Sequence, residues 1–267
     1  MSPTHRQYSL AREALAELRP EIAAQRALLM PHVRHIPAPA TPALEQVLAE
    51  IGALPREALF LGVAADGLPV LLNLHDATPG PLLLVADRGA GKTAFLQTIA
   101  HAAAILHPPE ETQFGVLTAR PEEWQGFAEL PQCAGIFPVY HNTGMDFLYS
   151  LGGWAHANKS ARQSVLLLLD DLTIMEHVDF DARQTLRWLL LRGPARRVWP
   201  IVTVNAEEGQ QVRAWLDAFR TRLYGQIRQC PDEFEETEAS TLFQSLKAGV
   251  QFALREGEGW LKFWIPT

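Results

Sequence analysis

The sequence predicts an α/β protein built on a doubly wound, mostly parallel sheet that is flanked by helices. The strongest indication is the run 164–171, Ser-Val-Leu-Leu-Leu-Leu-Asp-Asp, which is apolar on both faces, as in a parallel strand covered by helices on each side. A second is the segment 81–93, where an apolar strand leads through a glycine-bearing loop into a helix. A third is the alternation of strand-like and helix-like stretches that continues to residue 227.

Residues 1–40 are expected to form a helical arm and a stiff linker, and residues 41–267 to form the main domain. Leu15, Leu18 and Ile22 have helical spacing, and Pro20 is placed to end one helix and open the next. Prolines at positions 31, 37, 39 and 42 stiffen the linker. The arm has five arginines and three glutamates, which fits either a solvated helix face or contact with an acidic protein partner.

The main domain is expected to open with a short helix and a β-hairpin. Pro42 is suited to the first position of a helix that runs to about Glu50. The β-rich runs 58–64 and 68–74 flank an Asp-Gly dipeptide, which is a strong hairpin signal. This hairpin leads directly into the segment 81–93.

The remaining elements alternate, as a doubly wound sheet requires. Strands are expected at 113–118, 136–140, 164–171, 198–204 and 222–227. Helices are expected at 93–107, 124–130, 145–156, 183–191 and 212–219, with one more that ends near residue 247. The chain then closes with a hairpin formed by 250–254 and 260–265.

The glycine-bearing loop has the pattern of a phosphate-binding loop. That pattern asks for Gly, four residues, then Gly-Lys-Thr or Gly-Lys-Ser, and here Ala86 holds the first glycine position. Gly89 and Gly91 allow backbone N–H groups to turn inward toward anionic oxygens. Lys92 is expected to reach the β- and γ-phosphates, and the Thr93 hydroxyl to bind Mg²⁺. The expected nucleotide-binding residues are Asp87, Arg88, Gly89, Ala90, Gly91, Lys92 and Thr93.

Two acidic residues end the buried run 164–171. Asp170 falls at the carboxyl edge of the predicted sheet, where ligands bind in open parallel sheets, and there it is suited to hold Mg²⁺ through water. Asp171 is a candidate general base for the attacking water. The alternative is an acidic turn without a catalytic role, and Asp is one methylene shorter than the Glu that is common at this place.

Further candidates follow in the next helix and strand. Asn205 ends the strand 198–204, where its amide is placed either to sense the γ-phosphate or simply to open a turn. The stretch 182–197 has five arginines and no acid. Arg192, Arg196 and Arg197 are candidates for an arginine finger that acts on a neighbouring subunit. They fit equally well a surface for nucleic acid or an acidic protein, or a solvated helix face.

Composition narrows the class of protein. The formal net charge of −7 argues against nonspecific coating of nucleic acid, which relies on many lysines and arginines. The only cysteines, Cys133 and Cys230, are far apart, so neither a disulfide framework nor a zinc site is expected. No apolar run approaches the roughly 20 residues needed to span a bilayer. A soluble protein of the reducing cytoplasm is therefore expected.

In this order the motifs resemble the FtsK/HerA family of DNA-pumping P-loop ATPases. Over roughly residues 57–265, the hairpin before the loop, the loop itself and the middle segment 127–140 are similar to that family. The acidic pair followed by 172–175 is also similar, as are the finger-and-sensor region 192–204, the step 219–222 and the turn 257–260. The family positions held here by Ala86, Asp171, Asn205 and Arg220 carry Gly, Glu, Gln and Pro.

The resemblance implies a RecA-like P-loop NTPase fold and an ATPase that uses ATP and Mg²⁺. It would assign phosphate and metal binding to Lys92, Thr93 and Asp170, and the base position to Asp171. It also implies a homo-oligomer, typically a hexameric ring, that moves DNA. Two functions stay open: a ring-forming DNA motor, or a nucleotide-gated scaffold that scarcely hydrolyses ATP and docks a protein through its N-terminal arm.

Overall fold

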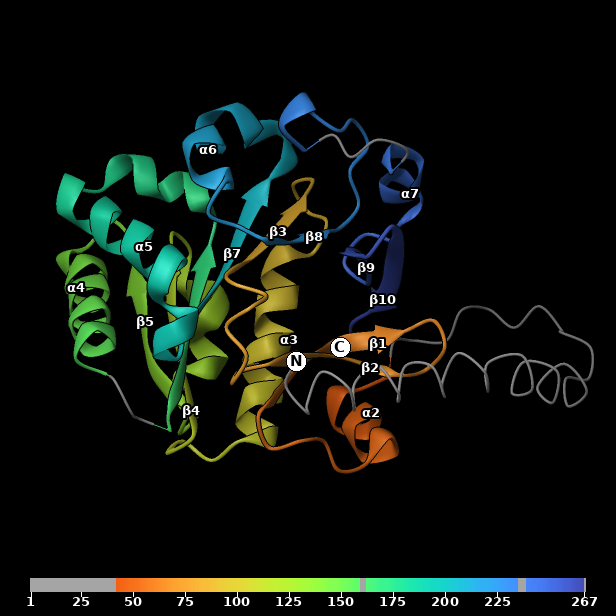
Figure 1. Cartoon of the computed structure of the whole chain (residues 1–267), viewed down its shortest axis with the longest axis horizontal. Helices are drawn as coiled ribbons and strands as arrows, with labels where there is room; N and C mark the ends of the chain where they lie inside the picture. The colour runs from red at the N-terminus through yellow and green to blue at the C-terminus, as the bar shows by residue number, and fades with distance from the viewer. Residues whose placement is uncertain (1–41, 159–161, 235–238, 267) are drawn as a thin grey trace, which may run out of the picture. The chain divides into compact units, whose positions relative to one another are not determined.

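The computed structural model describes residues 42–158, 162–234 and 239–266, and these contain one ten-stranded sheet with the order β2-β1-β10-β9-β8-β3-β7-β6-β4-β5 (Figure 1). The expected helical arm at 1–40 lies outside the described residues. None of the described helices is long and apolar enough to cross a membrane.

Six strands form a parallel half that contains the predicted doubly wound core. Their order is β8-β3-β7-β6-β4-β5, and every neighbouring pair in it runs parallel. The strands are β3 (Leu82–Ala86), β4 (Thr112–Thr118), β5 (Cys133–Pro138), β6 (Ser164–Asp170), β7 (Val198–Asn205) and β8 (Thr221–Tyr224). The prediction of an α/β fold with a mostly parallel sheet is therefore confirmed.

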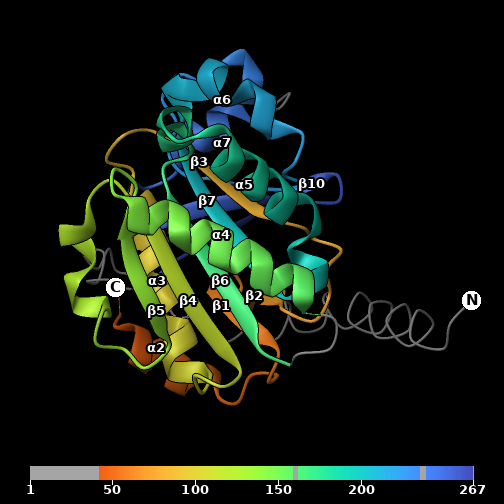
Figure 2. The ribbon, with the colours of Figure 1, turned by 90° about the vertical axis from the view of Figure 1, so that its left-hand side faces the viewer.

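Helices cover both faces of this half. Figure 2 shows α4 (Asn142–Ala157) and α5 (Phe180–Arg192) in front of the sheet and α3 (Lys92–Leu106) behind it. The leucines of β6 divide accordingly, because successive side chains of a strand point to opposite faces. Leu167 and Leu169 pack with α4 and α5, and Leu166 and Leu168 pack with α3. The short α2 (Leu44–Ile51) packs beside α3 and β1.

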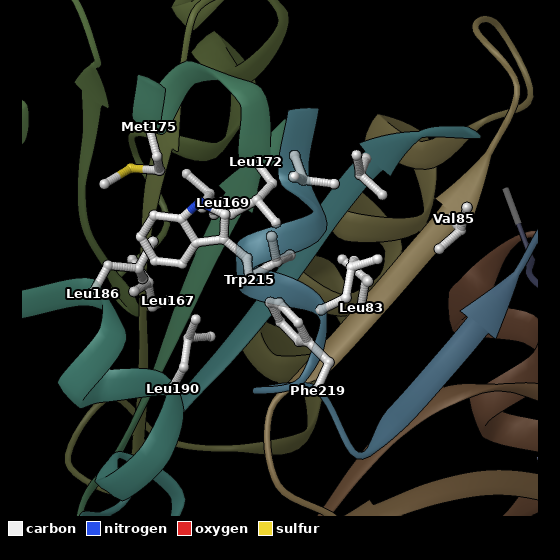
Figure 3. Packing of buried hydrophobic residues seen from close by; sticks show 14 of the residues in the cluster. Leu83, Val85, Leu167, Leu169, Leu172, Met175, Leu186, Leu190, Trp215 and Phe219 are labelled. Atoms are coloured by element: carbon white, nitrogen blue, oxygen red, sulfur yellow. The ribbon is translucent and has the colours of Figure 1, made fainter. Parts of the chain in front are cut away.

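The turn that follows β6 is anchored in the core by apolar side chains. It is a 3-10 segment, η2 (Leu172–His177), and Leu172 and Met175 in it are buried. Figure 3 shows Trp215 lying against these residues and Leu169. Trp215 belongs to α6 (Gly209–Leu216), which follows β7. Packing of α6 thereby holds in place the turn that directly follows the acidic pair.

Four strands form an antiparallel half. The expected hairpins are present as β1 (Ala58–Ala64) with β2 (Pro69–Asn73), and as β9 (Gln251–Glu256) with β10 (Gly259–Trp264). β10 also pairs with β1, and β9 with β8, so the two hairpins extend the parallel half into a single sheet. Gly62 permits the β1–β10 contact, since a Cβ there would lie 2.6 Å from the Phe263 ring.

Three expected elements differ in detail. Residues 121–127 form a 3-10 segment, η1, where a helix at 124–130 was expected, and β5 begins and ends earlier than expected. β8 ends at Tyr224 rather than near residue 227, although the backbone that follows it still bonds to β3 and to the first residue after β3. Gly225 N–H donates to Val85 O at 2.9 Å, and Gln226 O accepts from Asp87 N–H at 2.9 Å. The last described helix is α7 (Ser240–Ser245).

Candidate functional site

The loop between β3 and α3 has the backbone that its glycines predict. Gly89 and Gly91 have φ of 77° and 89°, in the left-handed region that favours glycine. Gly91 is also closely packed, because a Cβ there would lie 2.3 Å from the Cα of Gly249. The N–H of Gly249 donates to Ala90 O at 3.0 Å. The loop is thus braced by the turn that precedes β9, and it leads into the positive end of α3.

Lys92 lies at the start of α3 and is 9% exposed. Its Nζ donates to the carbonyl oxygens of Asp87 at 2.9 Å and Ala86 at 3.2 Å, so the ammonium spans the loop. Burial lowers the pKa of Lys92, and the carboxylates of Asp171 and Asp170 oppose that shift. Lys92 is therefore a buried cation with acidic groups on one side.

Asp170 ends β6 directly opposite the first turn of α3. The Thr93 hydroxyl lies 3.1 and 3.2 Å from its two carboxylate oxygens, and the Thr203 hydroxyl lies 3.4 Å from Oδ1. Asp170 is only 5% exposed. Burial raises the pKa of Asp170, against the lowering effects of the Thr93 hydrogen bond and of Arg120.

The pair of Thr93 and Asp170 fits a small divalent cation. Mg²⁺ prefers oxygen ligands and is typically held by one or two carboxylates together with substrate phosphates. A carboxylate that is buried with hydroxyls, and whose ionised form is penalised by burial, is a suitable partner for such a cation. No group of three or more His, Cys, Asp or Glu residues in the described ranges forms an all-protein metal cage. The fit is therefore to a cation that also binds phosphate.

Asp171 is held tightly by its surroundings. Its φ is 89°, which is rare for a residue other than glycine. Its N–H donates to the Thr203 hydroxyl at 2.9 Å. Its Oδ1 accepts from Thr173 N–H at 3.0 Å and from the Thr173 hydroxyl at 2.7 Å, so it caps η2.

Asn205 ends β7 beside the acidic pair and is 6% exposed. Its Nδ2 donates to Glu208 Oε2 at 2.7 Å and lies 3.4 Å from Asp171 Oδ2. Arg88, from the loop, pairs with Glu207 at 3.2 Å and with Glu208 at 3.5 Å. Sequence reasoning placed Arg88, Asp171 and Asn205 near the loop, but it missed Glu208, which connects two of them.

These groups surround a cavity of about 420 Å³. Its walls include Arg88, Gly89, Lys92, Thr93, Asp170 and Asn205. Of the other predicted loop residues, Asp87 and Ala90 bond to neighbouring segments: Asp87 Oδ2 accepts from Arg228 N–H at 3.0 Å, and Ala90 O accepts from Gly249. The cavity therefore lies where the strands β3, β6 and β7 end.

Arg120 also lines the cavity, and sequence reasoning missed it. It follows β4, whose carboxyl end lies beside that of β6. Its guanidinium lowers the pKa of Asp170 and donates to Glu123 Oε1 at 2.6 Å. The signal that could have found it is the same as for Asp170, namely a polar residue just after a predicted parallel strand.

The structure does not bring the predicted arginine cluster into this cavity. Arg192 ends α5, while Arg196 and Arg197 directly precede β7. The carbonyl of Arg197 accepts from Val165 N–H at 2.7 Å, which places it at the amino end of β6. β7 has eight residues, so Arg197 lies about 26 Å along the strand from Asn205. Any action of theirs on a phosphate would be on the site of another copy.

Comparison with known proteins gives structural but not sequence matches: no family model and no curated protein matches the chain. The cytoplasmic domain of the Thermomonospora curvata type VII secretion ATPase EccC is similar with a TM-score of 0.65 and 17% identity, over 85% of this chain and 32% of that chain. The cytoplasmic domain of EssC is similar with a TM-score of 0.64 and 15% identity, over 95% of this chain and 52% of that chain.

A third similar structure is the pCW3 conjugation coupling protein TcpA, in a form with ATPγS. Its TM-score is 0.58 at 11% identity, over 85% of this chain and 69% of that chain. The chain thus spans only 32% and 52% of the lengths of the EccC and EssC chains. At these identities the likeness establishes the fold.

Proposed function

Because the chain has the FtsK/HerA-like P-loop ATPase fold, we propose that it binds ATP with Mg²⁺ in the cavity between β3, β6 and β7 and hydrolyses it. The observation that carries this proposal is the approach of Thr93 to Asp170 at 3.1 Å, directly after a glycine loop at the start of α3. A strand-to-helix turn that merely contained Gly-Lys-Thr would not need a buried carboxylate opposite its threonine.

The backbone of the loop and Lys92 would bind ATP. The N–H groups around Gly89 and Gly91 and the positive end of α3 would bind phosphate oxygens. Lys92 would exchange its bonds to two carbonyl groups for bonds to the phosphates. Thr93 and Asp170 would hold Mg²⁺, which would offset negative charge on the phosphates when it is bound.

Hydrolysis needs an oriented water and stabilisation of the charge on the transferring phosphoryl group. In the family pattern Asp171 stands at the position of the base and Asn205 at that of a sensor for the γ-phosphate. Arg192, Arg196 and Arg197 would act on the site of a neighbouring subunit. Arg192 is exposed and forms no ion pair with any described residue, so it is available for such a contact. We propose a homo-oligomer that would allow this role, with a hexameric ring as the form that the resemblance to the FtsK/HerA family implies.

We further propose that the hydrolysis drives movement of DNA. Support comes from the fold, which is similar to a conjugation coupling protein and to secretion ATPases, proteins whose names describe transport. The second candidate function is a nucleotide-gated scaffold that binds ATP and scarcely hydrolyses it. Two observations favour this alternative, namely the net charge of −7 and the engagement of Asp171 as a helix cap.

One experiment separates these functions. Phosphate release is measured with ATP and Mg²⁺, with and without double-stranded DNA, while light scattering reports the mass of the particle. The motor predicts turnover that rises with DNA, and the Lys92→Ala variant should abolish it. The scaffold predicts ATP-dependent assembly with negligible turnover. A monomer that neither binds ATP nor releases phosphate would contradict both.

A further inference from the structure

Among the residues that the structure describes, three cationic side chains line the cavity, and they are held in different ways. Lys92 is buried and bonds to two carbonyl oxygens of the loop. Arg88 belongs to the loop and pairs with two glutamates that follow β7. Arg120 follows β4 and pairs with Glu123. Of these three, Arg120 alone comes from outside the loop and α3, and the binding of ATP as described above gives it no role.

The backbone of Arg120 is fixed beside the carboxylate that we propose holds Mg²⁺. Thr118, the last residue of β4, is the register partner of Asp170 at the end of β6. The Thr118 hydroxyl lies 3.5 Å from Asp170 Oδ2, and it accepts from the N–H of Arg120 at 3.0 Å. Arg120 thus follows the end of the strand adjacent to β6, at the edge where ligands of parallel sheets bind.

The side chain of Arg120 borders the cavity beside Thr93 and Asp170. Its charge is near enough to Asp170 to lower the pKa of that carboxyl. Its Nη1 donates to Glu123 Oε1 at 2.6 Å, and no other acceptor among the described residues bonds to the guanidinium. A guanidinium has five N–H donors in a planar fork, and this side chain is 57% exposed. Most of its donors can therefore exchange solvent for a ligand without breaking an internal hydrogen bond.

The order of the strands indicates which part of the nucleotide Arg120 meets. The loop follows β3, and Asp170 ends β6, which is two strands away. The cation held there would bridge the β- and γ-phosphates. Arg120 follows β4, one strand farther from β3 than β6 is. A phosphate tail that begins at the loop and reaches the cation therefore presents its last phosphate, rather than its first, to Arg120.

We propose that Arg120 binds the γ-phosphate of ATP from within the same chain. This inference rests on the proposed binding of ATP and Mg²⁺. The guanidinium would form charge-assisted hydrogen bonds to oxygens of the γ-phosphate, a group that ADP lacks. The site would then favour ATP over ADP before any neighbouring subunit contributes an arginine. During hydrolysis, the same contact would stabilise charge on the transferring phosphoryl group.

The test measures whether the contribution of Arg120 depends on the γ-phosphate. The full-length wild type is compared with Arg120→Ala, Arg120→Lys and Glu123→Gln, all with Mg²⁺ present. ATPγS and ADP are each used to displace a fluorescent ADP analogue, and phosphate release from ATP and thermal unfolding are measured in parallel. Glu123→Gln is the matched control, because it removes the ion pair of Arg120 but leaves the guanidinium at the cavity.

We expect Arg120→Ala to weaken the binding of ATPγS by about 10-fold or more, as for a lost charged hydrogen bond, and that of ADP by less than about 3-fold. ATP turnover should fall by about 100-fold. Arg120→Lys should recover part of the ATPγS affinity, since lysine keeps the charge without the planar fork. Glu123→Gln should change both affinities by less than about 3-fold, and thermal unfolding should hardly change, because the ion pair is exposed.

Four results would overturn the inference. In Arg120→Ala, the affinities for ATPγS and ADP weaken equally, or neither changes. In Glu123→Gln, the loss of ATPγS affinity matches that in Arg120→Ala, which would make Arg120 a structural partner of Glu123. A wild-type chain that binds neither nucleotide would reject the proposed function as well. By contrast, ATP turnover that Lys92→Ala abolishes and Arg120→Ala keeps would reject the role of Arg120 alone and leave the hydrolysis of ATP standing.

Discussion

The two edges of the parallel half carry charge in opposite ways. At the carboxyl edge, Lys92, Asp170 and Asn205 are all less than 10% exposed. Each forms a hydrogen bond within the site: Lys92 with the Asp87 carbonyl group, Asp170 with Thr93, and Asn205 with Glu208. At the amino edge, Arg56 pairs with Glu111 on the surface with 78% of its side chain exposed, and Arg197 donates to a carbonyl group. Burying charge costs free energy, whereas exposed charge costs little. Binding of a charged ligand at the carboxyl edge would offset this cost, so substitutions at the two edges should differ in their effect on activity.

The largest effect is expected for Lys92→Ala. Among the described residues, Lys92 is the only lysine that lines the cavity. Loss of its ammonium should lower ATP turnover by about 1000-fold, which corresponds to about 4 kcal/mol of transition-state stabilisation. Phosphate release measures it. Lys262→Ala, which removes an exposed lysine of β10, is the control and should keep wild-type turnover. Equal turnover in the two variants would contradict the assignment of Lys92 to the nucleotide-binding site.

Asp170→Asn should lower turnover by about 100-fold and yet stabilise the chain that lacks nucleotide. Because burial raises the pKa of Asp170 above 3.8, the folded chain binds that proton more tightly than the unfolded chain does. The stability gained in this way is present at low pH and is lost as pH rises through the raised, folded-state pKa. In urea titrations with EDTA, the variant should match wild type near pH 4 and exceed it near pH 7. A wild type that is the more stable at pH 7 would contradict this account.

Gly91→Ala should destabilise the fold by about 2 to 3 kcal/mol, because its Cβ adds a clash with Gly249 to the strain of a positive φ. Gly89→Ala is the matched control. It has a similar φ of 77° but open space around the added methyl group, so it should cost only about 1 kcal/mol. Urea denaturation of the two variants measures the difference. Equal losses would mean that the loop does not depend on its contact with Gly249.

The smallest effect is expected at the amino edge. Arg56→Ala removes an exposed ion pair with Glu111, so the free energy of unfolding should fall by less than about 0.5 kcal/mol. Analogue affinity should not change, because Arg56 lies far from the phosphate loop at the other end of the strands. A loss of affinity on this substitution would show that the two edges are coupled.

The core of the site was predictable because its residues are tied to strand ends. A glycine loop after one buried strand and an aspartate after another must meet at one edge of a parallel sheet, and Thr93 and Asp170 do so. Arg120 follows the same rule and was missed only because the residue does not belong to a familiar motif. Glu208 was beyond prediction, since its position depends on how the 3-10 segment after β7 turns toward Arg88.

The fold was also predictable where local sequence signals determine the elements, and not where segments far apart in the sequence pair. Buried apolar runs and local turn signals located the parallel strands and both hairpins. The pairing of β1 with β10 has no local signature, because Val63 and Trp264 are far apart in the sequence. The close approach of Gly62 to Phe263 accounts for this pairing, but only when the positions of both strands are already known.

The contact of Gly91 with Gly249 has a mechanical consequence. With too little space for even a methyl group between the two backbones, the phosphate loop cannot shift toward Gly249 unless the turn ahead of β9 yields with it. β9 is bonded to β10, and β10 to β1. A displacement of the loop toward Gly249 would thus act on the outer strands through backbone contacts and strand pairing.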